Sequence, residues 1–333
     1  MRKVAVFGAG SWGTAFSLVL ADAGNNVVVW ARREELSESI NAVHENLDYL
    51  PGVPLPDTIS ATHDPEEALA DADIAVLAVP SQSLRANLED WAKHIPDDAV
   101  VMSLMKGVEV GTSKRMSEVI AEVAGVGPER IAVLSGPNLS HEIAARQPAA
   151  AVIASTSESV AEHLQARCHS PSLRLYTNTD VVGCELGGAT KNVIALAVGM
   201  AVGLGFGDNS TATVITRGLA ETARLGEALG ADPYTFSGLA GLGDLVATCS
   251  SPLSRNRTFG EKLGQGMSVD EIAASTRQIA EGVKSCESIS DLAHRHDVEM
   301  PIVEAVAALV RGETTPQQML QALISRATKP ERA

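Results

Sequence analysis

The first apolar run of the chain ends in three glycines at a fixed spacing. Residues 4–7 are strand-like, the sequence GAGSWG follows, and a helical pattern over residues 14–23 ends at Gly24. In a strand-turn-helix unit, such glycines make the tight turn, let the backbone approach a pyrophosphate and let the helix pack on its strand. The helix N-terminus adds N–H groups and a positive dipole end for an anion. The pattern favours a dinucleotide site over a turn that binds nothing. The loop residues that we expect to contact the cofactor are Gly8, Gly10, Ser11, Trp12 and Gly13.

Short apolar runs alternate with helical stretches up to about residue 179. The runs are VAVFG, NVVVWAR, DIAVLAVP, AVVMSLMK, RIAVLSG, AAVIAS and LRLYTN. Continuous runs of this length are typical of strands buried on both faces of a parallel sheet. Beyond Asp180 the apolar residues recur three and four positions apart, as over residues 211–229 and 301–309. We predict an α/β protein with a doubly wound, Rossmann-type, mostly parallel sheet over residues 1–179 and an all-α domain over residues 180–333, tightly packed together.

The charge balance excludes several classes of partner. The chain has 333 residues, with 26 Lys and Arg against 41 Asp and Glu, for a net charge of −15. No general positive field attracts nucleic acid or an anionic membrane, so an anionic ligand needs a few placed cations or backbone N–H groups. We expect a small-molecule ligand and no nucleic-acid partner.

Cysteine use and hydropathy bear on location. The four cysteines lack CxxC spacing, which indicates reduced thiols in the cytoplasm. We expect no signal peptide, and no membrane span because the longest apolar stretch, residues 193–207, is short and holds four glycines. Within it, the GxxxG of Gly199 and Gly203 predicts close helix packing. No metal site is predicted, because His294 and His296 would point apart on a helix.

The end of the second strand bears on the choice of nucleotide. An NAD-preferring chain usually carries Asp or Glu there to hold the ribose 2′-OH, whereas this chain carries Arg32 and Arg33. Guanidinium groups can pair with a 2′-phosphate, so NADP(H) is favoured, with NAD(H) possible. The alternative is that both arginines are solvated residues at the start of the next helix, although the helix dipole does not favour them there.

Several segments later in the chain carry a family resemblance. They are CELGGATKN, TRG, GLGDL and SRNR, together with the earlier MKG and SGPN. In this order over nearly the whole chain, they resemble the bacterial NAD(P)-dependent sn-glycerol-3-phosphate dehydrogenases. The resemblance implies the interconversion of dihydroxyacetone phosphate and sn-glycerol 3-phosphate, which supplies the backbone of glycerophospholipids. Relatives commonly form homodimers, so a homodimer is a possible assembly.

Lys191 is the candidate proton donor for that reaction. A ketone reduced by hydride transfer needs a proton for the oxygen that becomes a hydroxyl. Lys191 precedes an apolar helical run, and the resemblance implies that it is the general acid and base. From the residues alone, a helix-capping or snorkelling lysine is an equal alternative. Asp244 is expected to orient Lys191 or to bind a substrate hydroxyl, and its alternative is a helix N-cap.

The SRNR segment is the candidate phosphate site. It offers a hydroxyl, a guanidinium and an amide in consecutive positions, all suited to phosphate oxygens. The resemblance implies that Ser254, Arg255 and Asn256 hold the substrate, with Arg255 also near the cofactor. Without it, an exposed helix start with Ser254 as N-cap is the better interpretation.

Two strand ends complete the predicted substrate site. Lys106 ends the run AVVMSLMK, and the resemblance implies contacts with both cofactor and substrate; a surface lysine is the alternative. Gly136 and Asn138 follow the next strand and are expected to meet the substrate, and Ser140 the cofactor. Here GPNLS replaces the commoner GPSFA of the family, so contacts through backbone should survive while those through side chains are open.

Ile279 and Glu281 match positions that approach the cofactor in the family. Two other functions stay open at this point. One is a different two-domain dehydrogenase, of a 6-phosphogluconate or 3-hydroxyacyl type, which would lack the SRNR cradle. The other is a non-catalytic nucleotide sensor, against which the placed Lys191 argues.

Overall fold

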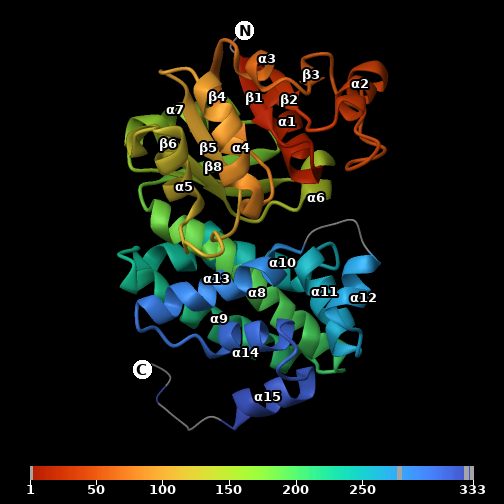
Figure 1. The fold of residues 1–333 in the computed structure, drawn as a ribbon, viewed down its shortest axis with the longest axis vertical. Helices are drawn as coiled ribbons and strands as arrows, with labels where there is room; N and C mark the ends of the chain where they lie inside the picture. Colours follow the sequence, from red (N-terminus) through yellow and green to blue (C-terminus); the bar gives the residue numbers. More distant parts are fainter. Residues whose placement is uncertain (1–2, 276–279, 326–329, 331–333) are drawn as a thin grey trace.

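The computed structural model describes residues 3–275, 280–325 and 330. A sheet flanked by helices forms one part, and a bundle of helices forms the other (Figure 1). Strand β8 (Leu173–Asn178) leads directly into helix α8 (Val181–Gly203), the first of the bundle. The predicted fold class, a mostly parallel Rossmann-type sheet followed by a helical region, is confirmed. The boundary at residues 179 and 180 stays a prediction.

The sheet has eight strands in the order β3-β2-β1-β4-β5-β6-β7-β8. Strands β1 to β6 are parallel, β7 pairs antiparallel with β6, and β8 pairs parallel with β7. The preceding strands are β1 (Lys3–Phe7), β2 (Asn26–Trp30), β3 (Ile59–Thr62), β4 (Ala72–Leu77), β5 (Val100–Ser103), β6 (Ile131–Ser135) and β7 (Ala149–Ser155). Strand β3 was not among the predicted strands, because its four residues, ISAT, form neither a long apolar run nor a sustained alternation.

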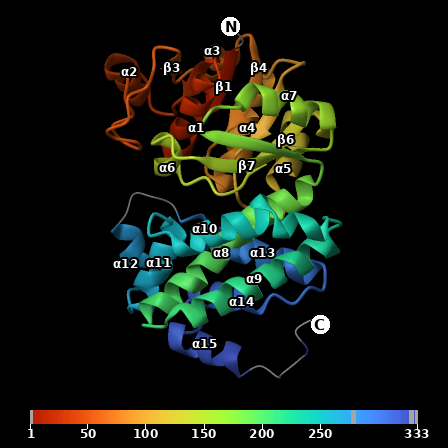
Figure 2. The ribbon, with the colours of Figure 1, turned by 180° about the vertical axis from the view of Figure 1, so that it is seen from behind.

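Helices cover both faces of the sheet (Figures 1 and 2). Alternate residues of β1 enter different apolar cores: Val4 and Val6 join the core that contains Phe16 of α1, while Ala5 and Phe7 join the other. This double burial explains why the strands are continuously apolar. The helices of this part are α1 (Ser11–Asp22), α2 (Glu34–Val43), α3 (Pro65–Leu69), α4 (Leu84–Trp91), α5 (Met116–Ala124), α6 (Ser140–Ala144) and α7 (Glu158–Cys168).

Helix α8 forms the axis of the bundle and is buried along most of its length. Its hydropathy of 1.3 would suit a membrane span, but 89% of the apolar stretch is buried inside the protein. It packs closely on α11 (Arg255–Gly264): a Cβ added at Gly199 would lie 2.0 Å from the Arg257 carbonyl oxygen, and one at Gly203 would lie 2.1 Å from that of Glu261. The GxxxG motif is therefore a helix-packing motif, as predicted.

The other bundle helices surround α8, and α15 lies farthest from the sheet (Figure 2). A 3₁₀ segment (Pro233–Ser237) and a π-helical turn (Leu239–Gly243) connect α9 to α10. The helices are α9 (Asp208–Ala228), α10 (Asp244–Ser250), α12 (Val269–Ala274), α13 (Glu281–Arg295), α14 (Pro301–Val310) and α15 (Pro316–Ile324).

Buried polar contacts join the two parts. The Glu185 carboxylate of α8 accepts hydrogen bonds from the Ser117 backbone N–H at 2.8 Å and from the Arg115 guanidinium at 2.7 Å. The Ser288 hydroxyl of α13 donates to the Val108 carbonyl at 2.8 Å. These contacts hold the bundle against the carboxyl ends of the central strands. All four cysteines are buried free thiols, and burial raises the pKa of each.

Candidate active site

The glycine loop has the geometry that a dinucleotide phosphate requires. Gly8 adopts a φ of +130°, which disfavours other residues, and a Cβ at Gly13 would lie 1.9 Å from the Gly8 carbonyl oxygen. A Cβ at Gly10 would meet nothing within 4 Å, so open space lies beside the N-terminus of α1. The turn, the close packing and the open approach correspond to the three expected glycine roles. The residues therefore fit a bound NAD(P).

Two other loop residues lie beside this space. The Trp12 indole N–H is buried without a hydrogen-bond partner among the described residues, and the Ser11 hydroxyl donates to the Tyr49 carbonyl at 2.7 Å. Asn46, which is fully buried, donates to the Ala9 carbonyl at 2.9 Å and to the Thr14 hydroxyl at 2.8 Å. Sequence reasoning missed Asn46, because its partners lie more than 30 residues away. These bonds fix the shape of the glycine loop.

Arg32 and Arg33 lie where β2 turns into α2. Both are exposed, and Arg33 occupies the N-cap position of α2. Arg33 pairs with Asp48, which raises the pKa of the guanidinium, whereas Arg32 has no polar partner among the described residues. Arg32 is thus the free guanidinium at this strand end, and Arg33 is already engaged.

Lys191, Asp244 and Lys106 form one buried cluster at the junction of the two parts. Asp244 is 1% exposed, and its Oδ1 accepts a hydrogen bond from Lys191 Nζ. Its Oδ2 accepts one from Lys106 Nζ at 2.7 Å. Asp244 is the first residue of α10, but its carboxylate binds the two lysines, and Gly243 holds the N-cap position. One carboxylate therefore fixes two ammonium groups from opposite sides of the junction.

The position of Lys191 on its helix corrects one expectation. Lys191 does not precede the apolar helix but lies within α8, which begins ten residues earlier at Val181. Asp180 caps that start by accepting from the Gly183 N–H at 2.8 Å. The two glycines before Lys191 concealed the helix, although Gly187 is needed there because its Cβ would lie 2.4 Å from the Ala240 carbonyl oxygen. A helix-capping role for Lys191 is therefore wrong.

Lys106 follows β5 and is held by three acceptors. Besides Asp244, its Nζ donates to the Gly136 carbonyl at 3.0 Å and to the Asn138 Oδ1 at 2.8 Å. Burial lowers the pKa of Lys106 from 10.5 to about 7; Asp244 opposes this shift, and Lys191 adds to it. Lys106 is thus a buried lysine poised to lose its proton near neutral pH, and not a surface lysine.

The GPNLS departure brings a side chain into the cluster. Asn138 Oδ1 accepts from Lys106, while its Nδ2 is buried with no partner among the described residues. The nearby Ser135 hydroxyl is also buried without one. Ser140 begins α6, with Leu139 at the N-cap. Unpartnered buried donors cost free energy unless a ligand satisfies them, so this wall of the site has unused hydrogen-bonding capacity.

The SRNR segment begins helix α11. Ser254 is the N-cap and accepts from the Arg257 N–H at 3.3 Å, as the capping interpretation expects. Asn256 is tied internally: it donates to Asn192 Oδ1 at 2.9 Å and accepts from the Gly282 N–H at 2.9 Å. The Arg255 side chain is exposed to solvent on one side, while the protein atoms around it desolvate the guanidinium and lower its pKa, a shift that the negative charge of Glu281 opposes. Arg255 is the available guanidinium of the segment.

Glu281 begins α13 and faces the sheet. Its Oε2 accepts from the Ser81 hydroxyl at 2.6 Å, and Ser81 lies just beyond β4. The first residue of α13 thus contacts the loop after β4, at the carboxyl edge of the sheet where ligands of such sheets bind, and the Gly282–Asn256 hydrogen bond holds the start of α11 beside it. Ile279, the other predicted cofactor contact of this segment, lies outside the described residues.

Comparison with known proteins identifies this arrangement. The family model described as NAD-dependent glycerol-3-phosphate dehydrogenase N-terminus matches residues 3–161, and that described as its C-terminus matches residues 180–321. The chain belongs to the NAD-dependent glycerol-3-phosphate dehydrogenase family. It is 64% identical over 330 residues to a glycerol-3-phosphate dehydrogenase [NAD(P)+] from Streptomyces griseus, covering 99% of this chain and 98% of that one. A relative of the same description from Thermobifida fusca is 64% identical over 333 residues, covering 100% of this chain and 99% of that one.

The fold agrees with this family. The crystal structure of a glycerol-3-phosphate dehydrogenase from Coxiella burnetii superposes with a TM-score of 0.93 at 37% identity, covering 98% of this chain and 99% of that one. A ketopantoate reductase from Ralstonia eutropha shares only the fold, at 17% identity and a TM-score of 0.59. The comparisons therefore favour the glycerol-3-phosphate dehydrogenase family over another two-domain dehydrogenase or a non-catalytic sensor.

The structure adds two residues of this family member that sequence reasoning did not single out. Thr248, one turn after Asp244, accepts a hydrogen bond from Lys191 Nζ at 2.8 Å. Asn192, next to Lys191, donates to the Lys106 carbonyl at 3.2 Å and accepts from Asn256. The i, i+4 spacing of Asp244 and Thr248 was a usable signal, because it places both on one helix face.

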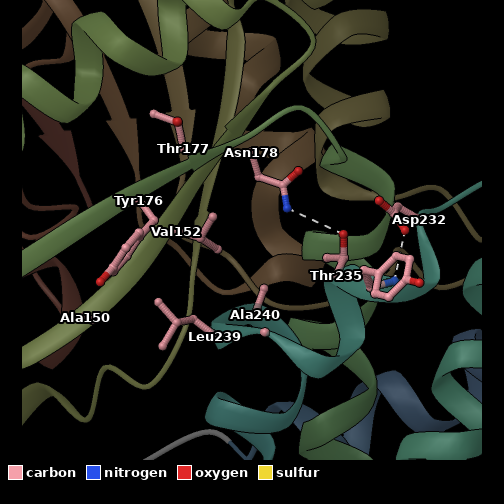
Figure 3. Close-up of a pocket in the computed structure, with 11 residues that line it drawn as sticks. Ala150, Val152, Tyr176, Thr177, Asn178, Asp232, Thr235, Leu239 and Ala240 are labelled. Atoms are coloured by element: carbon pink, nitrogen blue, oxygen red, sulfur yellow. Dashed lines mark hydrogen bonds between the residues drawn. The ribbon is translucent and has the colours of Figure 1, made fainter.

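A cavity of about 480 Å³ lies away from these residues, at the β7 and β8 edge of the sheet (Figure 3). Tyr176 and Asn178 line it from β8, and Leu239 from the π-helical turn. Asn178 Nδ2 donates weakly to the Thr235 hydroxyl at 3.5 Å. None of the predicted site residues that the structure describes lines this cavity.

Proposed function

We propose that this chain reduces dihydroxyacetone phosphate to sn-glycerol 3-phosphate at the junction of the sheet and the bundle, for glycerophospholipid synthesis. The observation that carries the assignment of the site is the buried Lys106–Asp244–Lys191 cluster. It lies beside the buried Asn138 Nδ2, which has no hydrogen-bond partner among the described residues, and near the carboxyl ends of the strands that follow the glycine loop. Bound NAD(P)H supplies the hydride for this chemistry.

Lys191 donates the proton in this proposal. As the carbonyl carbon is reduced, negative charge grows on its oxygen, and a positioned ammonium both stabilises that charge and transfers a proton. Asp244 and Thr248 hold two of the three donor directions of Nζ, which leaves one for the substrate oxygen. In the reverse direction the neutral amine of Lys191 takes the hydroxyl proton.

The phosphate end is assigned to Arg255 and the start of α11. The first N–H groups of a helix have no intrahelical partner and carry the positive end of the dipole. Ser254 stays at the N-cap in this arrangement, while Asn256 acts by tying α11 to α8 and α13. In an acidic chain, this local cradle replaces an overall positive field.

The decisive assay follows NADPH loss with the purified protein. We expect turnover with dihydroxyacetone phosphate and little with 3-oxoacyl ketones or with the larger ketose phosphate that a 6-phosphogluconate-type enzyme uses in the reducing direction. Neither compound places a short phosphorylated ketone between the lysine cluster and the Arg255 cradle. Oxidation of sn-glycerol 3-phosphate by NADP⁺ is the matched reverse reaction. Preference for a ketone that lacks a phosphate would overturn the assignment.

Replacing Arg255 tests the phosphate contact. Arg255→Ala should lower kcat/KM for dihydroxyacetone phosphate by about 10- to 100-fold, chiefly by raising KM, since a charged hydrogen bond is worth about 1.5–3 kcal/mol. Arg257→Ala is the matched control, because that guanidinium belongs to the same helix but pairs with Glu261. Steady-state kinetics at saturating NADPH measures both. Equal losses in the two variants would place the phosphate elsewhere.

Replacing both strand-end arginines tests nucleotide choice. We propose that NADP(H) is preferred and NAD(H) also used, so Arg32→Ala with Arg33→Ala should lower kcat/KM for NADPH by about tenfold and leave NADH nearly unchanged. A tenfold loss of kcat/KM is the lower end of the range for a charged contact, and we expect it here because both arginines are exposed and their charges are screened by solvent and salt. The wild-type preference should also shrink as salt rises. A wild type that prefers NADH contradicts the proposal.

Location and assembly are further proposals. Four buried free thiols, with no disulfide among them, suit a reducing cytoplasm. A homodimer is proposed only because relatives commonly form homodimers. Sedimentation of the purified protein measures the oligomeric state.

A further inference from the structure

We propose that Asp48 moderates the preference for NADP(H) by competing with the nucleotide 2′-phosphate for Arg33. The inference rests on the proposed placement of the nucleotide at the glycine loop and the β2 end. It assigns to Asp48 the role of a specificity-determining residue, which keeps NAD(H) usable in a site that carries two arginines.

Asp48 lies on a short segment, residues 44–50, that is fixed to the glycine loop. Asn46 is fully buried, and its Nδ2 donates to the Ala9 carbonyl at 2.9 Å and to the Thr14 hydroxyl at 2.8 Å. The Ser11 hydroxyl donates to the Tyr49 carbonyl at 2.7 Å. Asp48 therefore stands between two anchored residues, so its backbone cannot move freely when Arg33 takes another partner.

Arg32 and Arg33 differ in whether the guanidinium already has an acidic partner. Arg33 pairs with Asp48, and both side chains are about half exposed, at 49% and 47%. Arg32 has no polar partner among the described residues. The Tyr49 phenol also lies close enough to Arg33 to affect its pKa. Arg32 is thus free to bind a 2′-phosphate, whereas Arg33 must first break its ion pair with Asp48.

This difference affects the two nucleotides unequally. A 2′-phosphate that recruits Arg33 must displace Asp48, and the two anions repel each other at close range. A nucleotide with a free 2′-OH leaves the Arg33–Asp48 pair intact, so Arg33 keeps its partner when a neutral ribose binds. Asp48 therefore weakens the binding of NADPH without a matching effect on NADH, and the ratio of their efficiencies falls.

The test replaces Asp48 by its neutral isostere. Asp48→Asn should raise the ratio of kcat/KM for NADPH over NADH by about two- to fivefold, the range of a single exposed ion pair. Asp57→Asn is the matched control: Asp57 lies in the same connection between α2 and β3, is fully exposed and faces His44 at 3.9 Å, not Arg33. It removes the same charge and should leave the ratio nearly unchanged. In an Arg33→Ala background, Asp48→Asn should have no effect on the ratio.

The outcomes separate the inference from the proposed function. Equal shifts in the Asp48 and Asp57 variants would mean that only long-range charge acts, and would overturn the inference. A fall in NADPH efficiency in Asp48→Asn would show that Asp48 positions Arg33 for the phosphate, which also overturns it. Both outcomes leave turnover of dihydroxyacetone phosphate intact. Absence of turnover with either nucleotide in the wild type would refute the proposed function instead.

Discussion

Lys191→Met should lower kcat for dihydroxyacetone phosphate reduction by at least about 100-fold, the scale on which a lost general acid slows a reaction. Methionine keeps the length and apolar stem of the side chain in the buried middle of α8, so the helix should fold around it. The substitution removes the ammonium with its proton, its charge and its hydrogen bonds to Asp244 and Thr248, while Asp244 keeps Lys106 as a counter-charge. The dissociation constant of NADPH, measured by fluorescence titration, should change little because the glycine loop is untouched.

A matched surface variant controls for the loss of one lysine. Lys114→Met removes an exposed ammonium that pairs with Glu122, and an exposed pair of this kind contributes little to stability. Its kcat should remain near that of the wild type. Near-normal turnover in a folded Lys191→Met protein would remove Lys191 from the mechanism and leave Lys106 as the candidate donor, since it contacts the same carboxylate.

The sequence alone was enough to predict those features whose residues lie close together in the chain. The glycine loop was predictable because turn, anion approach and helix packing all lie within six consecutive residues, and the structure shows the geometry of each. Ser254 as a helix N-cap was predictable for the same reason. The doubly wound sheet followed from strands buried on both faces, which leave continuous apolar runs.

Local sequence was insufficient where a contact spans distant segments. Lys106 and Asp244 are 138 residues apart, and their hydrogen bond depends on how the bundle docks on the sheet. The helical pattern of α8 was obscured before Lys191, because glycines that lower helix propensity stand where the packing of a neighbouring backbone requires them. Asn46 illustrates the same limit, because its partner Thr14 lies 32 positions away in the sequence and only the fold brings the two together. Tertiary packing, and not propensity, determined these features.

Asp244→Asn should have an effect of similar size on activity and a larger one on stability. The carboxylate is the shared counter-charge of Lys106 and Lys191, and an amide of the same shape cannot replace that charge. Lys191 then loses its fixed orientation, so kcat/KM should fall by about 100- to 1000-fold, the scale for a misplaced catalytic group. Asp291→Asn, an exposed position on α13, is the control.

The expected loss of stability is about 3 kcal/mol, from urea unfolding near neutral pH. Removing one partner of a buried ion pair usually costs about 3–5 kcal/mol, because the other charge stays buried and unpaired. We expect the lower end of this range because Lys106, whose pKa is already lowered to about 7, can lose its proton and so leave no unpaired charge at its position.

The sign of the pH dependence distinguishes this cause from a simple packing defect. Because the pKa of Lys106 is lowered to about 7 in the folded protein from 10.5, the unfolded chain binds more protons in between, and wild-type stability should rise with pH across that window. Without Asp244, which raises the pKa of Lys106, the folded variant keeps this lysine neutral to a lower pH. As the pH falls through 7, Lys106 becomes protonated in the folded wild type, where Asp244 stabilises its charge, but stays neutral in the folded variant. The wild type and Asp244→Asn should therefore differ more in their free energies of unfolding at pH 6 than at pH 9. A difference that stays constant with pH would mean that the amide disturbs packing and that the charge of Asp244 has no role in holding Lys106.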